Sequence, residues 1–137
     1  MFTLSEDEAD VCDLMRVFLR ALDHGEEAGV ESCFSTDVHA RVDAVAHVGR
    51  EGLAKLLRRA AATGGTGIRT HMIGNPAVDV AGDEAIVGAD VRALEVRRDG
   101  VGVTVWRLRA YAQRQRGQWL VCGLLLDHVG TEAHAAR

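Results

Sequence analysis

The spacing of the apolar residues changes along this chain, and that change limits the folds it can adopt. After residue 68 the apolar residues alternate as in long strands, broken by turns at Gly82-Asp83, Asp99-Gly100 and Gly117. Near the start of the chain they recur every three or four positions, the spacing of an amphipathic helix, as in Val11, Leu14, Met15, Phe18, Leu19 and Leu22. Helices followed by hairpin-connected strands predict an α+β domain, with three N-terminal helices packed in a curved, mainly antiparallel sheet.

Local signals predict where each element begins and ends. Ser5 and Glu8 form a capping box that starts the first helix, and Gly25 ends it. Asp23 lies one turn beyond Leu19, at the flank of the apolar face of this helix. We expect a second helix over 26–34, a strand over 37–48, a third helix after Gly49, four strands at 68–81, 84–97, 101–116 and 118–127, and frayed ends at 1–6 and 130–137.

Length and composition exclude several classes of function. With 137 residues, 47% of them hydrophobic, the chain fits one domain over residues 1–137 that has its own core. A net charge of −4 with scattered basic residues argues against nucleic-acid binding. The acidic N-terminus and the absence of a long apolar run predict a cytoplasmic protein without membrane contact. Three separated cysteines, Cys12, Cys33 and Cys122, indicate reduced thiols rather than a disulfide framework or zinc site.

Turn positions also predict which strand residues share a face of the sheet. With Gly82 and Asp83 as a two-residue loop, Asn75 lies opposite Asp90 and His71 opposite Leu94. The same count across the later turns predicts an apolar wall with a few polar groups, which is the composition of a small-molecule pocket. This wall comprises Ile73, Ile86, Trp106, Leu108, Trp119, Val121, Leu125 and Asp127.

The other face of the sheet is expected to be apolar too. It gathers Met72, Val78, Val87, Val91, Val103, Val105, Leu120, Cys122, Leu124 and Leu126. Because a sheet face exposed to water is seldom so apolar, this pattern predicts a homodimer that packs sheet against sheet.

The polar residues of the pocket face suggest acid–base chemistry. His71 lies within an apolar run, and an imidazole exchanges protons near neutral pH. Asp90 beside Asn75 is a candidate second acid. The alternatives are a hydrogen-bonded core histidine and a simple cross-strand hydrogen bond between Asn75 and Asp90. For Asp23, position alone also allows a plain carboxylate at the surface end of a helix.

No metal site is expected. His39, Arg41, Asp43 and His47 share one strand face, but side chains two residues apart on a strand point in parallel about 6.6 Å apart. They therefore do not converge on one ion. The candidate substrate-binding residues are Phe18, Ile73, Asn75, Trp106, Leu108 and Trp119, several of which are equally suited to core packing.

Two segments give the chain a family resemblance. The element order, Gly-Arg-Glu-Gly-Leu at Gly49–Leu53 and Arg-Thr-His-Met-Ile-Gly-Asn-Pro at Arg69–Pro76 together resemble the SnoaL-like branch of the nuclear-transport-factor-2-like superfamily. The resemblance implies a cystatin-like α+β cone or barrel, similar to scytalone dehydratase, polyketide cyclases and ketosteroid isomerase-like proteins.

The resemblance also implies roles for two residues. In dehydratase-like members, an aspartate at the end of the first helix and a histidine after the third helix act together on the substrate, and Asp23 and His71 occupy the matching positions. A tyrosine often precedes that aspartate, and another often follows the Arg-hydrophobic-Asp segment of the first strand. This chain departs from the pattern, because it has Leu22 and Ala44 at those positions.

The implied activity is that of a cofactor-independent lyase or isomerase, such as a dehydratase or cyclase. Its substrate would be a small hydrophobic carbonyl compound of polyketide, steroid or terpenoid type. Because both tyrosines are missing, the alternative is a non-catalytic module of the same fold that binds a small molecule or supports oligomerisation.

Overall fold

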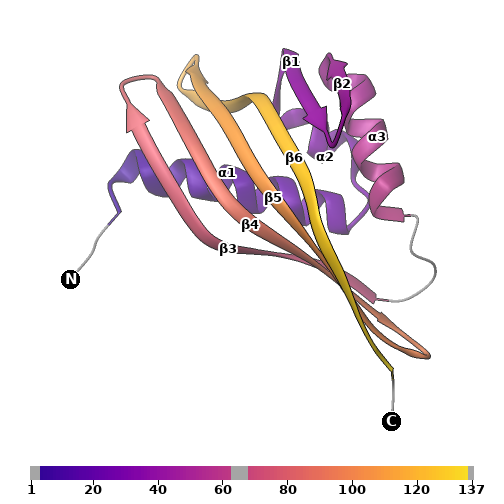
Figure 1. Ribbon diagram of the computed structural model, residues 1–137. Coiled ribbons are helices and arrows are strands. Elements are labelled where there is room, and N and C mark those ends of the chain that lie inside the picture. Colours follow the sequence, from indigo (N-terminus) through magenta and orange to yellow (C-terminus); the bar gives the residue numbers. More distant parts are fainter. Residues whose placement is uncertain (1–3, 63–67, 136–137) are drawn as a thin grey trace.

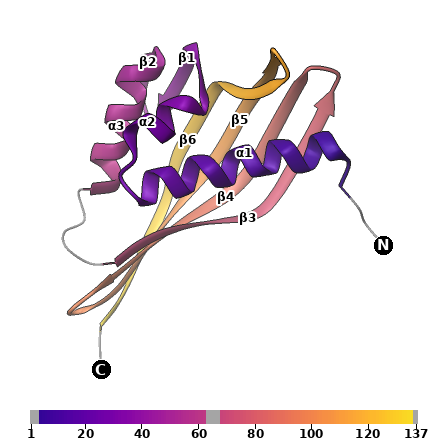
Figure 2. The ribbon, with the colours of Figure 1, turned by 180° about the vertical axis from the view of Figure 1, so that it is seen from behind.

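The computed structural model describes residues 4–62 and 68–135. Its elements are helices α1 (Glu6–Asp23), α2 (Glu27–Ser32) and α3 (Arg50–Ala62), and strands β1 (Phe34–Val42), β2 (Val45–Val48), β3 (Ile68–Ala81), β4 (Glu84–Arg97), β5 (Gly100–Gln115) and β6 (Gln118–Ala135). Figure 1 shows an open, curved sheet with the helices on one side, and Figure 2 shows α1 lying across that side. The α+β class expected from the sequence is confirmed.

The six strands form one mixed sheet in the order β2-β1-β6-β5-β4-β3. Strands β3 to β6 are joined by hairpins and pair antiparallel, whereas β1 and β6 pair parallel. The first long strand of the chain therefore lies beside the last one. Within the residues described, no helix is long and apolar enough to cross a membrane.

Helix α1 begins as the capping box predicts. The amide of Glu8 donates to Ser5 Oγ at 3.1 Å, and the amide of Ser5 donates to Glu8 Oε1 at 3.3 Å. Both bonds satisfy amides that a helix start leaves without partners. The apolar face of α1 then packs into the concave side of the sheet, where Val11, Met15, Phe18, Leu19 and Leu22 are buried.

The core lies between the helices and the concave face of the sheet. Phe18 of α1 and Phe34 of β1 meet at its centre, with ring centroids 5.5 Å apart and a tilt of 57°. Such offset ring pairs add about 0.5–1.5 kcal/mol beyond the apolar area that they bury. Other large side chains withdrawn from solvent here include Met15, Leu53, Leu108 and Leu124.

Three predicted boundaries were wrong. The strand expected over 37–48 is a hairpin of β1 and β2, turned at Asp43 and Ala44; Asp43 has a φ of +52°, which a short polar side chain tolerates. The second helix ends at Ser32, and Phe34 already pairs with Val121. The C-terminal tail does not fray from residue 130, because β6 continues along β5 to Ala135.

A bulge in β3 changes the predicted strand register. Near the turn the pairing is as expected, with Ala81 opposite Glu84 and Ala77 opposite Gly88. Between Gly74 and Ala77 the register shifts by one residue, and Asn75 has a φ of +48°. Beyond this bulge His71 lies opposite Ala93, not Leu94, and Asp90 lies opposite Gly74, not Asn75.

Because side chains alternate between faces, the shift separates residues that were expected together. His71 and Ile73 share the concave face with Val91, Ala93 and Trp106. Asp90 belongs to the convex face, which turns away from the helices. Ile86, Leu94, Leu125 and Asp127 were predicted beside His71 and also lie on the convex face.

The bulges and pairings also change the composition of the face expected to form a dimer. Val78, Val87, Val91, Leu124 and Leu126 are turned toward the helices. Met72, Val103, Val105, Leu120 and Cys122 remain on the convex face, where charged residues accompany them. The homodimer through this face stays a prediction: five of its ten apolar residues face the helices, whereas Ile86, Leu94 and Leu125, expected on the pocket face, lie on the convex face instead.

Candidate functional site

Asp23 and His71 meet where the end of α1 reaches β3. The His71 backbone amide donates to Asp23 Oδ2 at 3.0 Å, and His71 Nδ1 pairs with Asp23 Oδ1. Thr70 Oγ1 lies 3.5 Å from the same Oδ2. One carboxylate thus binds both the backbone and the ring of His71, which fixes the position and the rotation of the imidazole.

Hydrogen-bond chemistry assigns the roles of the two ring nitrogens. An ionised carboxylate can only accept, so the bond to Asp23 places a proton on His71 Nδ1. In the neutral ring Nε2 then carries the lone pair and is free to take up a proton. Among the described contacts none engages Nε2, so this is the atom that would act on a substrate.

The position of Asp23 is not explained by the stability of its helix. It is the last residue of α1, where the helix dipole favours cations over carboxylates by about 0.3–1 kcal/mol. Its side chain is 14% exposed and that of His71 is 10% exposed, which contradicts the interpretation of Asp23 as a surface residue. The contact with His71 and Thr70 accounts for a carboxylate at this place.

Small and apolar side chains surround His71 on the concave face. Ala93 lies opposite it on β4, and Thr104 continues the same row on β5. The next row holds Ile73 and Trp106. The rings of Trp106 and His128 pack edge-on, with their centroids 5.2 Å apart. Two of the predicted substrate-binding residues, Ile73 and Trp106, therefore share the face and the end of the sheet with His71.

One acidic residue on this face, Glu95, was not predicted from the sequence. Glu95 lies two residues beyond Ala93 on β4, so its side chain points to the same side as the His71 ring. One of its carboxylate oxygens is shielded from solvent. The sequence places Glu95 on the same strand face as Ala89, Val91 and Ala93. It does not indicate that this is the concave face, which becomes clear only from the burial of Val91.

Other predicted pocket residues do not lie beside His71. Phe18 and Leu108 are each 1% exposed, and Phe18 is engaged with Phe34 in the core. Trp119 pairs in register with Arg114, near the turn between β3 and β4, and Arg114 lies over its ring at 4.9 Å. Ten residues of strand separate that row from the row of His71, roughly 30 Å.

The predicted second acid is also misplaced. Asp90 and Asn75 both line a hollow on the convex face of the sheet, on the far side from Asp23 and His71. The physical reason is the bulge at Asn75, which reverses the faces of β3 relative to β4. Asp90 therefore cannot exchange protons directly with His71. Among the described residues, no three histidine, cysteine or acidic side chains converge as metal ligands would.

Comparison with known families gives a match over most of the chain. The profile of the SnoaL-like domain matches residues 3–124, a span that includes both Asp23 and His71. A comparison with curated protein sequences found no match.

Several solved structures share the fold at low sequence identity. A proposed scytalone dehydratase from Novosphingobium aromaticivorans superposes with a TM-score of 0.78 at 19% identity, covering 96% of this chain and 89% of that one. The hexachlorocyclohexane dehydrochlorinase LinA-type3 from Novosphingobium barchaimii also gives 0.78 at 19% identity, covering 93% and 90%. An NTF2-like protein with a cystatin-like fold, from Novosphingobium aromaticivorans, gives 0.78 at 21% identity, covering 90% and 82%.

Proposed function

Because this chain belongs to the SnoaL-like domain family, we propose that it is a cofactor-independent lyase or isomerase in which His71 transfers the proton. Its substrate would be a small hydrophobic carbonyl compound of polyketide, steroid or terpenoid type. The observation that supports this proposal is that Asp23 bonds to both the backbone amide and the ring of His71. A histidine needed only for packing would not require a partly buried carboxylate at the end of a helix.

The geometry supports a simple elimination. His71 Nε2 takes a proton from the carbon next to the carbonyl, and the C–H electron pair forms the new double bond as hydroxide leaves the neighbouring carbon. The imidazolium returns its proton to the departing oxygen, so water is the second product. Asp23 stabilises the imidazolium between these steps and keeps Nε2 aimed at the substrate.

The structural relatives favour elimination over other reactions of a histidine. A dehydratase removes water and a dehydrochlorinase removes hydrogen chloride, and proteins with both names share this fold. Each reaction requires a base that takes a proton beside a leaving group. His71 meets this requirement without a metal ion or an organic cofactor.

The alternative is a module of the same fold that binds a small molecule without reaction. One observation favours it: the chain has a single tyrosine, Tyr111, which lies 39% exposed on the convex face. No phenol can therefore polarise a carbonyl beside His71. Leu22, which replaces one of the family tyrosines, is buried, and Ala44, which replaces the other, is exposed in a turn.

Turnover of a β-hydroxyketone distinguishes the two functions. We expect the protein to convert 4-hydroxy-4-phenylbutan-2-one into its enone and water, followed by ultraviolet absorbance, and to exchange the α-hydrogen in D2O. The His71→Gln variant should lose about 10²–10⁴ of the rate, the usual contribution of one acid–base group. The bond from the residue-71 amide to Asp23 survives this change, so the fold should be retained.

The matched control is His39→Gln, which removes an exposed histidine of β1. It should leave turnover and melting temperature unchanged. Saturable binding of the ketone without turnover by the unaltered protein would support the binding module. Full activity of a folded His71→Gln protein would remove His71 from the mechanism.

A further inference from the structure

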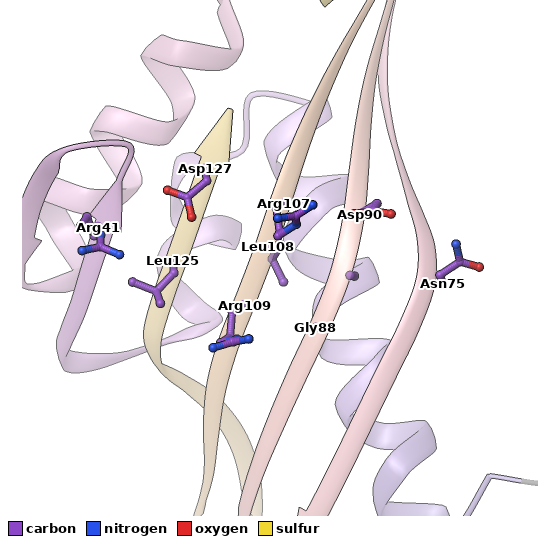
Figure 3. A pocket seen from close by; sticks show the side chains of 10 residues that line it. Arg41, Asn75, Gly88, Asp90, Arg107, Leu108, Arg109, Leu125 and Asp127 are labelled. Carbon is purple, nitrogen blue, oxygen red and sulfur yellow. The ribbon is translucent and has the colours of Figure 1, made fainter. Parts of the chain in front are cut away.

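A hollow of about 390 Å³ lies on the convex face of the sheet, behind the site of Asp23 and His71 (Figure 3). This volume is within the range of about 300–1,000 Å³ that is usual for small-molecule sites. Side chains from β1, β3, β4, β5 and β6 surround it. Its polar residues are Arg41, Asn75, Asp90, Arg107, Arg109 and Asp127.

Two of the arginines form a row with an apolar residue between them. Arg41 of β1 pairs in register with Leu125 of β6, which pairs in turn with Arg109 of β5. Strands lie about 4.8 Å apart, so the two arginine backbones are roughly 10 Å apart, and both long side chains can reach over Leu125. Neither guanidinium makes an ion pair or hydrogen bond within the described part of the chain.

The neighbouring row contains more acid than base, with a net charge of −1. Asp127, Arg107 and Asp90 follow one another across β6, β5 and β4, so an acid flanks Arg107 on each side. The row of Arg41 and Arg109 contains no acid. With three arginines and two aspartates the hollow carries a net charge of +1. Arg41 and Arg109 are the arginines with no acid in their own row, and a guanidinium binds carboxylate and phosphate groups through paired hydrogen bonds.

One residue that lines the hollow, Gly88, is a glycine that the fold does not explain. Gly88 lies opposite Arg109 inside β4, where glycine weakens a strand. Its φ is not positive, and a Cβ built there would meet no atom within 4 Å. Neither backbone conformation nor packing explains this glycine, whereas a ligand seated against the strand would.

We propose that this hollow binds a small organic molecule that carries a carboxylate or phosphate group. The anionic group lies between Arg41 and Arg109, and the apolar part of the molecule rests on Leu125 and over Gly88. Asn75 and Asp90 meet polar groups at the far end of the molecule. This site is separate from Asp23 and His71 and does not depend on the function proposed for them.

A second copy of the chain is the competing occupant. The homodimer was predicted from ten apolar residues, of which five face the helices. The hollow itself is lined by the row of Arg41 and Arg109 and by the row of Asp127, Arg107 and Asp90, while the exposed Ile86 and Tyr111 pair in the next row of the convex face. Two copies pressed together here would bury charges at a cost, whereas a small anion neutralises the arginines directly.

Calorimetric titration at low ionic strength tests the proposal with phenyl phosphate, benzoate and the neutral control benzyl alcohol. We expect saturable binding of at least one anion, no binding of benzyl alcohol, and weaker binding as salt screens the charges. The tighter of the two anions identifies which group the site prefers. Amide shifts in NMR spectra should be confined to the strand segments around Gly88, Arg109 and Leu125.

Variants locate the binding site. Arg41→Gln and Arg109→Gln should each weaken binding roughly tenfold, the loss expected when one charge-assisted hydrogen-bonded partner is removed. Gly88→Val should abolish binding while the melting temperature is kept or raised, because a Cβ at this position meets no atom within 4 Å and valine favours a strand more than glycine does. The control Arg92→Gln removes an exposed arginine of the same face outside the hollow, and His71→Gln leaves the hollow intact. Both controls should bind normally.

Three results would overturn the proposal. The first is the absence of saturable binding by either anion. The second is an equal loss of binding in Arg92→Gln, which would indicate anions held loosely by any arginine. The third is a dimer in sedimentation experiments that Gly88→Val dissociates, which would make the hollow part of a subunit interface.

Discussion

At the scale of the residue, the candidate chemistry depends on two side chains 48 positions apart. Nothing in the spacing of the apolar residues joins Asp23 to His71; the pairing was predicted from the family resemblance, and the structure confirms the contact. The catalytic role stays a prediction. Residue patterns alone could place His71 within a strand and Asp23 near a helix end, but no local signal reports a contact between segments that the chain brings together only on folding.

A second residue-scale property is the state of the buried thiols. Burial raises the pKa of the Cys33 thiol above its ordinary value of 9.0, opposed by a hydrogen bond from Ser32. The unfolded chain therefore releases this proton at a lower pH than the folded chain does. The stabilisation from the neutral thiol is complete below about pH 9 and is lost as the pH rises through the folded-state pKa.

This difference predicts how stability depends on pH. The free energy of unfolding, measured in urea, should fall as the pH rises above about 9, and it should fall less steeply in Cys33→Ala. The variant keeps Cys12 and Cys122, whose thiol pKa values burial also raises, so part of the slope remains. Identical slopes in the two proteins would show that Cys33 does not contribute.

At the scale of the element, helices and hairpins could be predicted from the sequence, but bulges could not. Capping residues and apolar spacing are local, so the limits of α1 and of β4 follow from a few neighbouring side chains. A bulge inserts one residue without changing the turn, and apolar alternation simply resumes on the other face. The prediction that Asp90 shares a face with His71 therefore failed at the bulge of Asn75. The neighbouring Pro76 was the only local sign of irregularity there.

The bulge itself makes a testable prediction at Asn75. Its φ of +48° suits glycine and asparagine but not a β-branched residue. Asn75→Gly should retain the stability of the protein to within about 0.5 kcal/mol, whereas Asn75→Val should lose on the order of 1–3 kcal/mol. Chemical denaturation measures both. A stable Asn75→Val protein would mean that the chain can realign β3 without its bulge.

At the scale of the whole molecule, one side chain ties the start of α1 to the far end of the sheet. Arg114 of β5 donates to Asp7 Oδ1 at 2.7 Å, to Asp83 Oδ1 at 2.9 Å and to the Gly82 carbonyl at 3.2 Å. Its guanidinium also lies over the Trp119 ring. This contact fixes one end of α1 across the concave face, while Asp23 fixes the other end.

Removing this tie should loosen the helix from the sheet. Arg114→Met should lower the melting temperature and speed hydrogen exchange in the first turns of α1. Arg16→Met is the matched control, because among the described residues this arginine contacts only Asp13, in an exposed ion pair. Exposed pairs of that kind contribute about 0–1 kcal/mol. Equal effects of the two substitutions would show that Arg114 acts only locally.

The parallel pairing of β1 with β6 has a consequence for how the molecule is made. On the ribosome, β1 emerges well before its neighbour β6. Until then one side of β1 offers free amides and carbonyls, the kind of surface to which chaperones and other nascent chains add strands. A chain that stops before β6 would thus leave β1 without its neighbour, although it would still contain both Asp23 and His71.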